Sequence, residues 1–449
     1  MEKRILLFFV FALLIQSVEA QKTDIQALLG AATKFFPLLN AKQMEIQALK
    51  KRSDLVDIAK RPSLDASYQA DLATYNNLTG MFLSNGITPI SGPPSVKNFF
   101  EPVFGSAAAL LATWQPFAFG QDVRQKKVID SEANVKKAES DNELFYYQIR
   151  VLNAYLDWQL AGELVDVFQK NVERAEELSK QVNALTINGL KPASDSAMLI
   201  GEISRLKIEV LNAQKLQEAY RISLNNFIGT NDNFKKERLF FEKLPVLDAL
   251  QTVDNHPLIR LSTSQIGVGE AQIELIKNQL VPKLQFWGTT YARGSGVKAN
   301  GETNFINGLG LQRFNYGFGA QISYPLLRGA EIKTQTQAQE ILTESYRERL
   351  KNNKIQLTEN QRIAANTLES ALKVVREMPN QKQANDYVLQ ALTGRYKNGL
   401  VAFSEIIQAQ YGVIKTESDT KKAYWEAWKA LLFQSATGGD VNIFLNQLN

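Results

Sequence analysis

The 449-residue chain carries 51 basic and 46 acidic residues, which gives a formal net charge of +5. The charges are interleaved along the sequence, and this excludes a concentrated surface for nucleic acid. Cysteine is absent and His256 is the only histidine, which argues against a thiol nucleophile, a histidine–carboxylate relay and a Cys/His zinc site. We therefore expect no cofactor and no metal.

Residues 1–20 have the pattern of a secretory signal peptide. Lys3 and Arg4 form a basic start, residues 5–15 are apolar, and small residues lead up to Ala20. A membrane anchor is the other reading, but an apolar run of about 11 residues is short against the roughly 20 that span a bilayer. No cysteine follows this run, which excludes a lipid-anchored lipoprotein. We expect cleavage after Ala20 and export of the mature chain.

The first half of the mature chain, residues 21–230, is predicted to form one structural repeat. A helix ends before Pro62, because proline stops a helix, and alternating apolar and polar residues then indicate a strand. After a second strand, a helix with heptad spacing is long enough for roughly 100 Å at about 1.5 Å per residue. The expected elements are strands at about 63–75 and 106–117, a loop at 76–105, a long helix at about 120–188 and a return helix at 194–228.

The second repeat, residues 256–439, follows a linker at 231–255. It has the same order of elements, and we expect Pro379 to interrupt its long helix. A short tail of residues 440–449 carries no pattern. The expected elements are a helix from Pro257, strands at about 283–293 and 312–326 around a loop at 294–311, a long helix at about 329–397 and a return helix at 404–434.

Short motifs recur in the same order roughly 210 residues apart, as expected of one unit used twice. Pro116-x3-Gly-x-Asp returns as Pro325-x3-Gly-x-Glu, where each second strand meets a long helix. The tips of the helical hairpins also match. We expect each tip glycine to end a long helix in the left-handed conformation, and Ser194 to cap the next helix. The tip motifs are Asn188-Gly189-Leu190 with Ser194-Asp195, and Asn398-Gly399-Leu400 with Ser404-Glu405.

Each pattern alone leaves two readings. The strands suit half of a soluble sheet or a transmembrane barrel, and four strands cannot close a barrel around a pore unless several chains share it. Aromatic residues near the strand ends suit either cross-strand packing or an interface girdle. The long heptad helices suit a soluble coiled-coil rod. We expect His256 on the solvent side of a helix start. The aromatic residues are Trp114, Trp287, Tyr75, Tyr291 and Tyr324.

In this order of motifs the chain resembles the TolC-like outer membrane efflux protein family over nearly all of its mature length. The resemblance implies an α+β membrane protein that assembles as a homotrimer in the outer membrane of a Gram-negative bacterium. Each half of each chain would give two strands to a shared twelve-stranded barrel and long coiled-coil helical hairpins to a periplasmic tunnel. Residues 76–105 and 294–311 would face outside.

The resemblance also places the tips where the tunnel opens and a periplasmic adaptor docks. Two features depart from the family pattern. Val401 and Gln408 stand where charges often lie, and Lys191-Pro192 makes the first tip unlike the second. The candidate docking residues are Asn188, Gly189, Leu190, Ser194, Asp195, Tyr396, Asn398, Gly399, Leu400, Ser404 and Glu405. The candidate residues of the pore constriction are Asp195, Glu405 and Gln408.

The leading functional hypothesis is a passive exit duct of a tripartite efflux or type I secretion system. Its implied partners are an adaptor (membrane fusion) protein, an inner-membrane pump of the RND or ABC type, and outer membrane lipid. The chain has no Gly-x4-Gly-Lys-Ser/Thr loop to bind nucleotide. Few Met and His residues argue against a dedicated metal exporter. An exported coiled-coil scaffold or adhesin without a channel is the alternative. An enzyme ranks third, because no pair of acids converges by spacing.

Overall fold

The computed structural model describes residues 24–74, 76, 95–231, 233–247, 252–298 and 301–448. It separates into two compact units. The helical unit comprises the described residues up to 46, from 134 to 265 and from 345 onward, and the sheet unit comprises those in 47–133 and 266–344. The expected signal peptide, Tyr75 and most of the loop at 76–105 lie outside the described residues.

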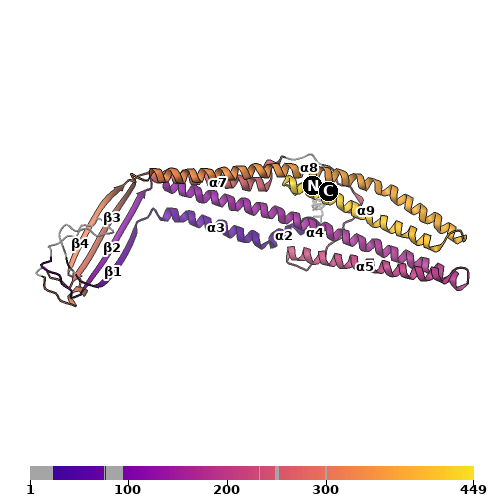
Figure 1. Ribbon diagram of the computed structural model, residues 1–449, viewed down its shortest axis with the longest axis horizontal. Coiled ribbons are helices and arrows are strands. Elements are labelled where there is room, and N and C mark those ends of the chain that lie inside the picture. The colour runs from indigo at the N-terminus through magenta and orange to yellow at the C-terminus, as the bar shows by residue number, and fades with distance from the viewer. Residues whose placement is uncertain are drawn as a thin grey trace, which may run out of the picture. The chain divides into compact units, whose positions relative to one another are not determined.

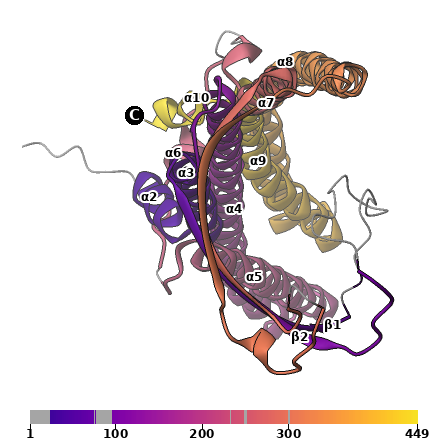
Figure 2. The same ribbon diagram turned by 90° about the vertical axis from the view of Figure 1, so that its left-hand side faces the viewer.

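The described residues of the sheet unit form one antiparallel sheet in the order β1-β2-β3-β4 (Figure 1), and its strands lie close to the four predicted ranges. Figure 2 shows that its strands curve along their length. β4 ends before the expected limit because Pro325 has no N–H for the ladder, and the β2–β3 register shifts beside Pro116 for the same reason. The strands are β1 (Ser63–Ala73), β2 (Val103–Phe117), β3 (Lys283–Ser295) and β4 (Arg313–Ser323).

The long helices lie close to their predicted ranges and form a pair of long hairpins, α4 with α5 and α8 with α9, whereas α2, α6 and α10 are not predicted (Figure 1). The sequence of helix, two strands, long helix and return helix occurs in both halves. Unit boundaries fall within α3, α4, α7 and α8. The helices are α2 (Asp24–Phe35), α3 (Pro37–Ile58), α4 (Gln121–Ile187), α5 (Ala193–Ile228), α6 (Leu239–Glu242), α7 (Pro257–Lys277), α8 (Gly329–Lys397), α9 (Phe403–Gly438) and α10 (Asn442–Leu445).

The expected linker and tail contribute to the core of the helical unit. Phe240 of α6 and Phe444 of α10 are buried against Trp428 of α9, with ring centroids 5.1 and 5.8 Å from that indole. The indole nitrogen of Trp428 donates to the Lys243 carbonyl at 3.2 Å. Both segments are too short for a periodic pattern, so their role as a cover for the long helices is invisible in the sequence.

His256 is fully buried, and the expectation of a solvent-side residue is wrong. Its Nδ1 accepts the Leu258 N–H at 3.1 Å, which caps the start of α7, and Nε2 lies 3.1 Å from the Ala436 carbonyl of α9. A neutral ring with its proton on Nε2 satisfies both bonds. Burial lowers the pKa of His256, and this favours that neutral form.

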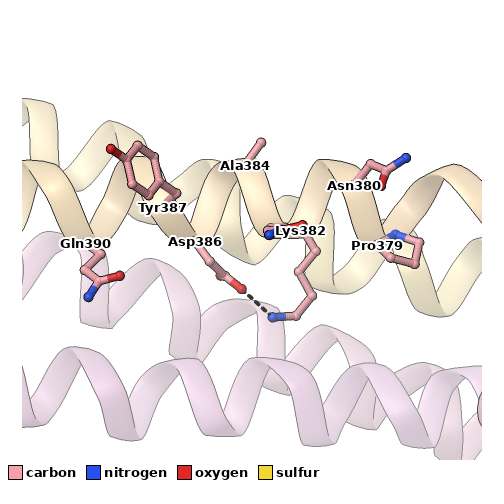
Figure 3. Close-up of a pocket in the computed structure, with 8 residues that line it drawn as sticks. Pro379, Asn380, Lys382, Ala384, Asp386, Tyr387 and Gln390 are labelled. Carbon is pink, nitrogen blue, oxygen red and sulfur yellow. Dashed lines mark hydrogen bonds and ion pairs between the residues drawn. The ribbon is translucent and has the colours of Figure 1, made fainter.

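Pro379 does not interrupt α8, which runs through it (Figure 3). The proline cannot donate to the Val375 carbonyl one turn earlier. A shallow pocket of 810 Å³ lies along this part of α8, and its Lys382 and Asp386 form an ion pair at 2.6 Å. Among the described residues, no helix combines the length and hydropathy needed to cross a bilayer.

Candidate functional site: the hairpin tips

The two long helices end in the same backbone turn. Gly189 and Gly399 have φ of 68° and 74°, the left-handed conformation that glycine adopts without strain. Around Gly189, the glycine N–H reaches the Thr186 carbonyl at 3.0 Å, and the Leu190 N–H reaches the Leu185 carbonyl at 2.9 Å. This pair of bonds defines the Schellman motif. The prediction of left-handed helix stops is therefore confirmed.

The second tip repeats these bonds. The Gly399 N–H reaches the Tyr396 carbonyl at 2.9 Å, and the Leu400 N–H reaches the Arg395 carbonyl at 3.0 Å. The asparagine before each glycine also forms the same side-chain hydrogen bond at both tips. The side-chain amides of Asn188 and Asn398 each donate to the carbonyl four residues earlier, at 2.7 and 3.0 Å. At the first tip this bond adds to the one that the Ala184 carbonyl accepts from the Asn188 backbone N–H at 3.3 Å, so each asparagine binds to the last turn of its own helix.

The starts of the return helices correct the sequence prediction. The N-cap of α5 is Pro192, in an extended conformation with ψ of 145°, and Ser194 is an exposed residue inside the first turn. In the second tip the N-cap is Ala402, and Ser404 is likewise exposed. Neither serine caps its helix. Proline is well suited to this place because it lacks an N–H and its φ fits an extended cap.

Three side chains join the two tips. The Tyr396 hydroxyl, from the last turn of α8, donates to Oδ2 of Asp195 in the first turn of α5, at 2.6 Å. Lys191 donates to the Tyr396 carbonyl at 2.9 Å, and its Nζ lies 4.1 Å from the centre of that ring. Tyr396 and Asp195 are only 5% and 7% exposed. Burial and then the bond to Asp195 raise the pKa of Tyr396.

An apolar cluster lies beneath this junction. The Phe403 ring packs 5.2 Å from the Tyr396 ring, and Ile406, Leu199 and Val182 belong to the same buried group. These residues come from α4, α5, α8 and α9, so all four long helices meet here. The position of Tyr396 thus depends on packing in both hairpins, and a movement of one tip against the other would expose apolar surface.

The three candidates for the pore constriction differ. Asp195 is buried and bonded to Tyr396, so its carboxylate is withdrawn from solvent, contrary to the expectation for a pore-lining acid. Glu405 is exposed and accepts the Ala402 N–H at 3.3 Å, which caps its own helix. Gln408 is exposed. From the sequence, Lys191 is known only as a residue in which the two tips differ. In the structure it is part of the junction.

The sheet has one apolar face and one polar face, and no layer of described residues covers the apolar one. On β4 the side chains of Tyr316 and Phe318 are 85% and 84% exposed, and on β1 that of Leu64 is 70% exposed. The outer edges of β1 and β4 have no partner strand among the described residues. The apolar face includes Leu64, Ala66, Tyr68, Ala70, Leu72, Leu110, Ala112, Trp114, Leu284, Phe286, Gly288, Phe314, Tyr316, Phe318, Ala320 and Ile322.

The expected girdle aromatics divide between the faces. Trp114 lies on the apolar face and donates its indole N–H to the Lys60 carbonyl at 3.0 Å. Trp287 lies on the polar face, where its ring covers Gly319, and Tyr291 shares that face. A girdle position is therefore wrong for Trp287 and Tyr291, and the strand register explains why, since their parity is opposite to that of Trp114.

The described residues contain no group of His, Asp or Glu side chains arranged to hold a metal ion. No model of a protein family matches the sequence. No curated protein sequence is similar to it either.

Solved structures of outer-membrane channels share the fold over most of the chain. A CusC structure has a TM-score of 0.72 and 13% identity, and covers 93% of this chain and 92% of its own. VceC from Vibrio cholerae gives 0.68 and 13%, with 93% and 96% covered. The open state of MtrE from Neisseria gonorrhoeae gives 0.67 and 16%, with 93% and 89% covered. The chain thus has the fold of TolC-family outer-membrane channels.

Proposed function

We propose that this protein is the outer-membrane channel of a tripartite efflux or type I secretion system. It conducts substrates passively, and the energy comes from an inner-membrane pump. The observation that carries the proposal is the sheet, whose apolar face is exposed while its other face is polar. That pattern, on strands of 11 to 15 residues, is typical of barrel strands between lipid and a water-filled lumen.

The open edges of the sheet support a homotrimer. In lipid, unpaired N–H and C=O groups are costly, so β4 of one chain must pair with β1 of the next. This contact joins two different edges and closes only as a ring. Three chains of four strands each give the twelve-stranded barrel. The two halves of the chain act as repeats, and each supplies one strand pair and one helical hairpin.

Unpartnered apolar stripes on the long helices also support the ring. On α5, Ile200, Leu211 and Ile222 are exposed at helical spacing, and α8 has a second stripe that includes Ile363 and Val374. Both stripes lie in the helical unit. Exposed apolar rows of this kind mark contact surfaces. We assign them to the contacts between neighbouring chains of a periplasmic tunnel.

We assign the tips to gating and docking. The junction of Lys191, Asp195 and Tyr396 holds the two hairpins together, and opening requires that these contacts break. Glu405 and Gln408 face the constriction in this account, whereas Asp195 positions Tyr396. The Schellman turns at Gly189 and Gly399 present the backbone to an adaptor protein, which links the channel to an RND or ABC pump. The exported chain lies in the outer membrane with its hairpins in the periplasm.

The proposal is tested in a strain that lacks its own exit duct. We expect the chain to fractionate with the outer membrane, to migrate as a heat-sensitive trimer and to restore dye export when its adaptor and pump are present. A protein that reaches the cell surface or periplasm as a coiled-coil scaffold, without a trimer in the outer membrane, would contradict it.

A further inference from the structure

The apolar face of the sheet is not flat but contains a notch. Ala112 of β2 and Gly288 of β3 pair directly, and Ala320 of β4 lies diagonally from Gly288, because it pairs with Phe286. Larger side chains rise around them. The notch has a volume of 590 Å³, its floor is formed by Ala112, Gly288 and Ala320, and its walls by Trp114, Phe286 and Phe318.

The notch is open and its walls are held. A Cβ atom built on Gly288 meets nothing within 4 Å, so the space above the floor is free of protein. The Trp114 ring packs 6.0 Å from the Phe286 ring, and its indole N–H is bound to the Lys60 carbonyl. Lys60 is itself paired with Asp122 at 2.5 Å. This wall therefore has a defined position.

We propose that the notch binds one acyl chain of a phospholipid, a proposal that rests on the channel function. An empty notch in the hydrocarbon region of the membrane would lose the dispersion contacts of its lining. Water is a poor occupant, because the apolar lining gives it few hydrogen-bond partners. A flexible hydrocarbon chain fits an apolar notch of this kind. A neighbouring copy of the protein does not supply the occupant, because its β1 would pair with β4 in the plane of the sheet and would leave the outward face above the notch open.

The place of the notch selects phospholipid rather than lipopolysaccharide. Pro62 lines its end, directly before β1 begins and after α3. In the proposed function this end of the sheet faces the periplasm, where the leaflet is made of phospholipid. Arg61 directly precedes Pro62 in the sequence. Its guanidinium group is suited to bind the phosphate of a lipid headgroup.

The test fills the notch and compares it with a matched site on the same face. Gly288→Leu places its Cβ where no atom lies within 4 Å, and Ala320→Leu fills the same notch from β4. Ala66→Leu is the control, because Ala66 of β1 has the same outward direction but does not line the notch. The trimer is extracted, delipidated, and titrated with a phosphatidylglycerol of defined chain length under native mass spectrometry.

We expect the wild type and Ala66→Leu to bind one phospholipid per chain, and both notch variants to bind it at least tenfold more weakly. Equal lipid binding by all four proteins, or displacement of the phospholipid by an equimolar amount of lipopolysaccharide, would overturn the proposal. Trimer assembly in the outer membrane is measured on the same samples. Trimeric variants with unchanged lipid binding refute only the notch, whereas a wild type that is not a membrane trimer refutes the channel function.

Discussion

The first tip and the second tip have the same backbone but different side chains. Both end a long helix at a left-handed glycine, with the same pair of Schellman bonds and the same asparagine amide bond. Beyond the glycine they diverge. The first tip carries Lys191 and buries Asp195 against Tyr396, whereas the second has Val401 and leaves Glu405 exposed.

This difference separates two tasks. The turn that is common to both tips sets the shape of the end of each hairpin. In the proposed function, an adaptor protein can therefore contact the same backbone shape at both tips. The contacts found only at the first tip tie it to the second, so they are suited to hold the junction closed. In the proposed function, the repeated turn forms the docking surface, and the bond between Asp195 and Tyr396 is the latch that holds the two tips together.

The largest expected effect comes from a change in the common turn. Valine at Gly189 and Gly399 together should strain each turn by about 1–2 kcal/mol, through its backbone conformation alone, because a Cβ at either site meets nothing within 4 Å. The trimer should still assemble in the outer membrane, whereas dye export should be lost.

The control for this variant is a change at Asn85 and Asn300, which lie outside the described residues and in the loops assigned to the cell exterior. It should leave export intact. Full export by the double valine variant at a normal level of trimer would show that the tips are only turns and that the adaptor docks elsewhere.

Replacement of the two tip acids should have unequal effects on stability and on the pore. Asp195→Asn weakens a buried bond to a charged acceptor, and we expect a loss of about 1.5–3 kcal/mol in the free energy of unfolding. Glu405→Gln changes an exposed residue and should cost under about 0.5 kcal/mol. Only the first change should raise the fraction of time that the pore is open. Denaturant titration and single-channel conductance measure the two effects, and equal losses would refute the assignment of the latch to the first tip.

Alkaline pH should act through Tyr396. Its folded pKa is raised by burial and by Asp195, so above about pH 10 the unfolded chain loses a proton that the folded chain keeps. Stability contributed by this residue is present below that pH and is lost as the pH rises. Tyr396→Phe should remove this part of the pH dependence in thermal unfolding measured from pH 8 to pH 11. An unchanged alkaline slope would mean that another group causes it.

The smallest effect is expected at Lys191. Its equivalent in the second tip is Val401, so Lys191→Val makes the tips more alike and removes one bond to the Tyr396 carbonyl. A partly exposed bond of this kind contributes about 0.5–1.5 kcal/mol. Thermal unfolding of the trimer should shift by a few degrees at most, and the reverse change, Val401→Lys, should not compensate for it. A loss of stability as large as that of Asp195→Asn would show that Lys191, and not Asp195, is the main residue of the latch.

Much of the fold follows from local patterns. The alternation along Phe314 to Ile322 specifies a strand with one apolar face, and the prolines and glycines around it specify where the elements end. The left-handed stops at Gly189 and Gly399 could also be predicted, since glycine before a second helix has few other uses.

The latch could not be predicted, because Tyr396 and Asp195 are far apart in the sequence and neither carries a periodic signal. Only tertiary packing brings them together. The sequence favours Ser194 as a cap because a serine before an acid is a strong local motif, whereas the cap position of Pro192 depends on its backbone angles. The burial of His256 cannot be predicted from the sequence either, because it depends on packing between α7 and α9. One bond of its ring is to α7 and the other is to a carbonyl of α9.

The most direct test of the central claim uses the absence of cysteine from the chain. Ser67 of β1 is replaced by cysteine, and a second cysteine is placed in turn at Asn315, Gly317 or Gln321 of β4, on the same polar face. After oxidation in outer membranes, the account predicts that one pairing gives a ladder on denaturing gels that stops at three linked chains. No crosslink in any pairing, or a ladder that extends beyond three, would contradict a closed trimeric barrel.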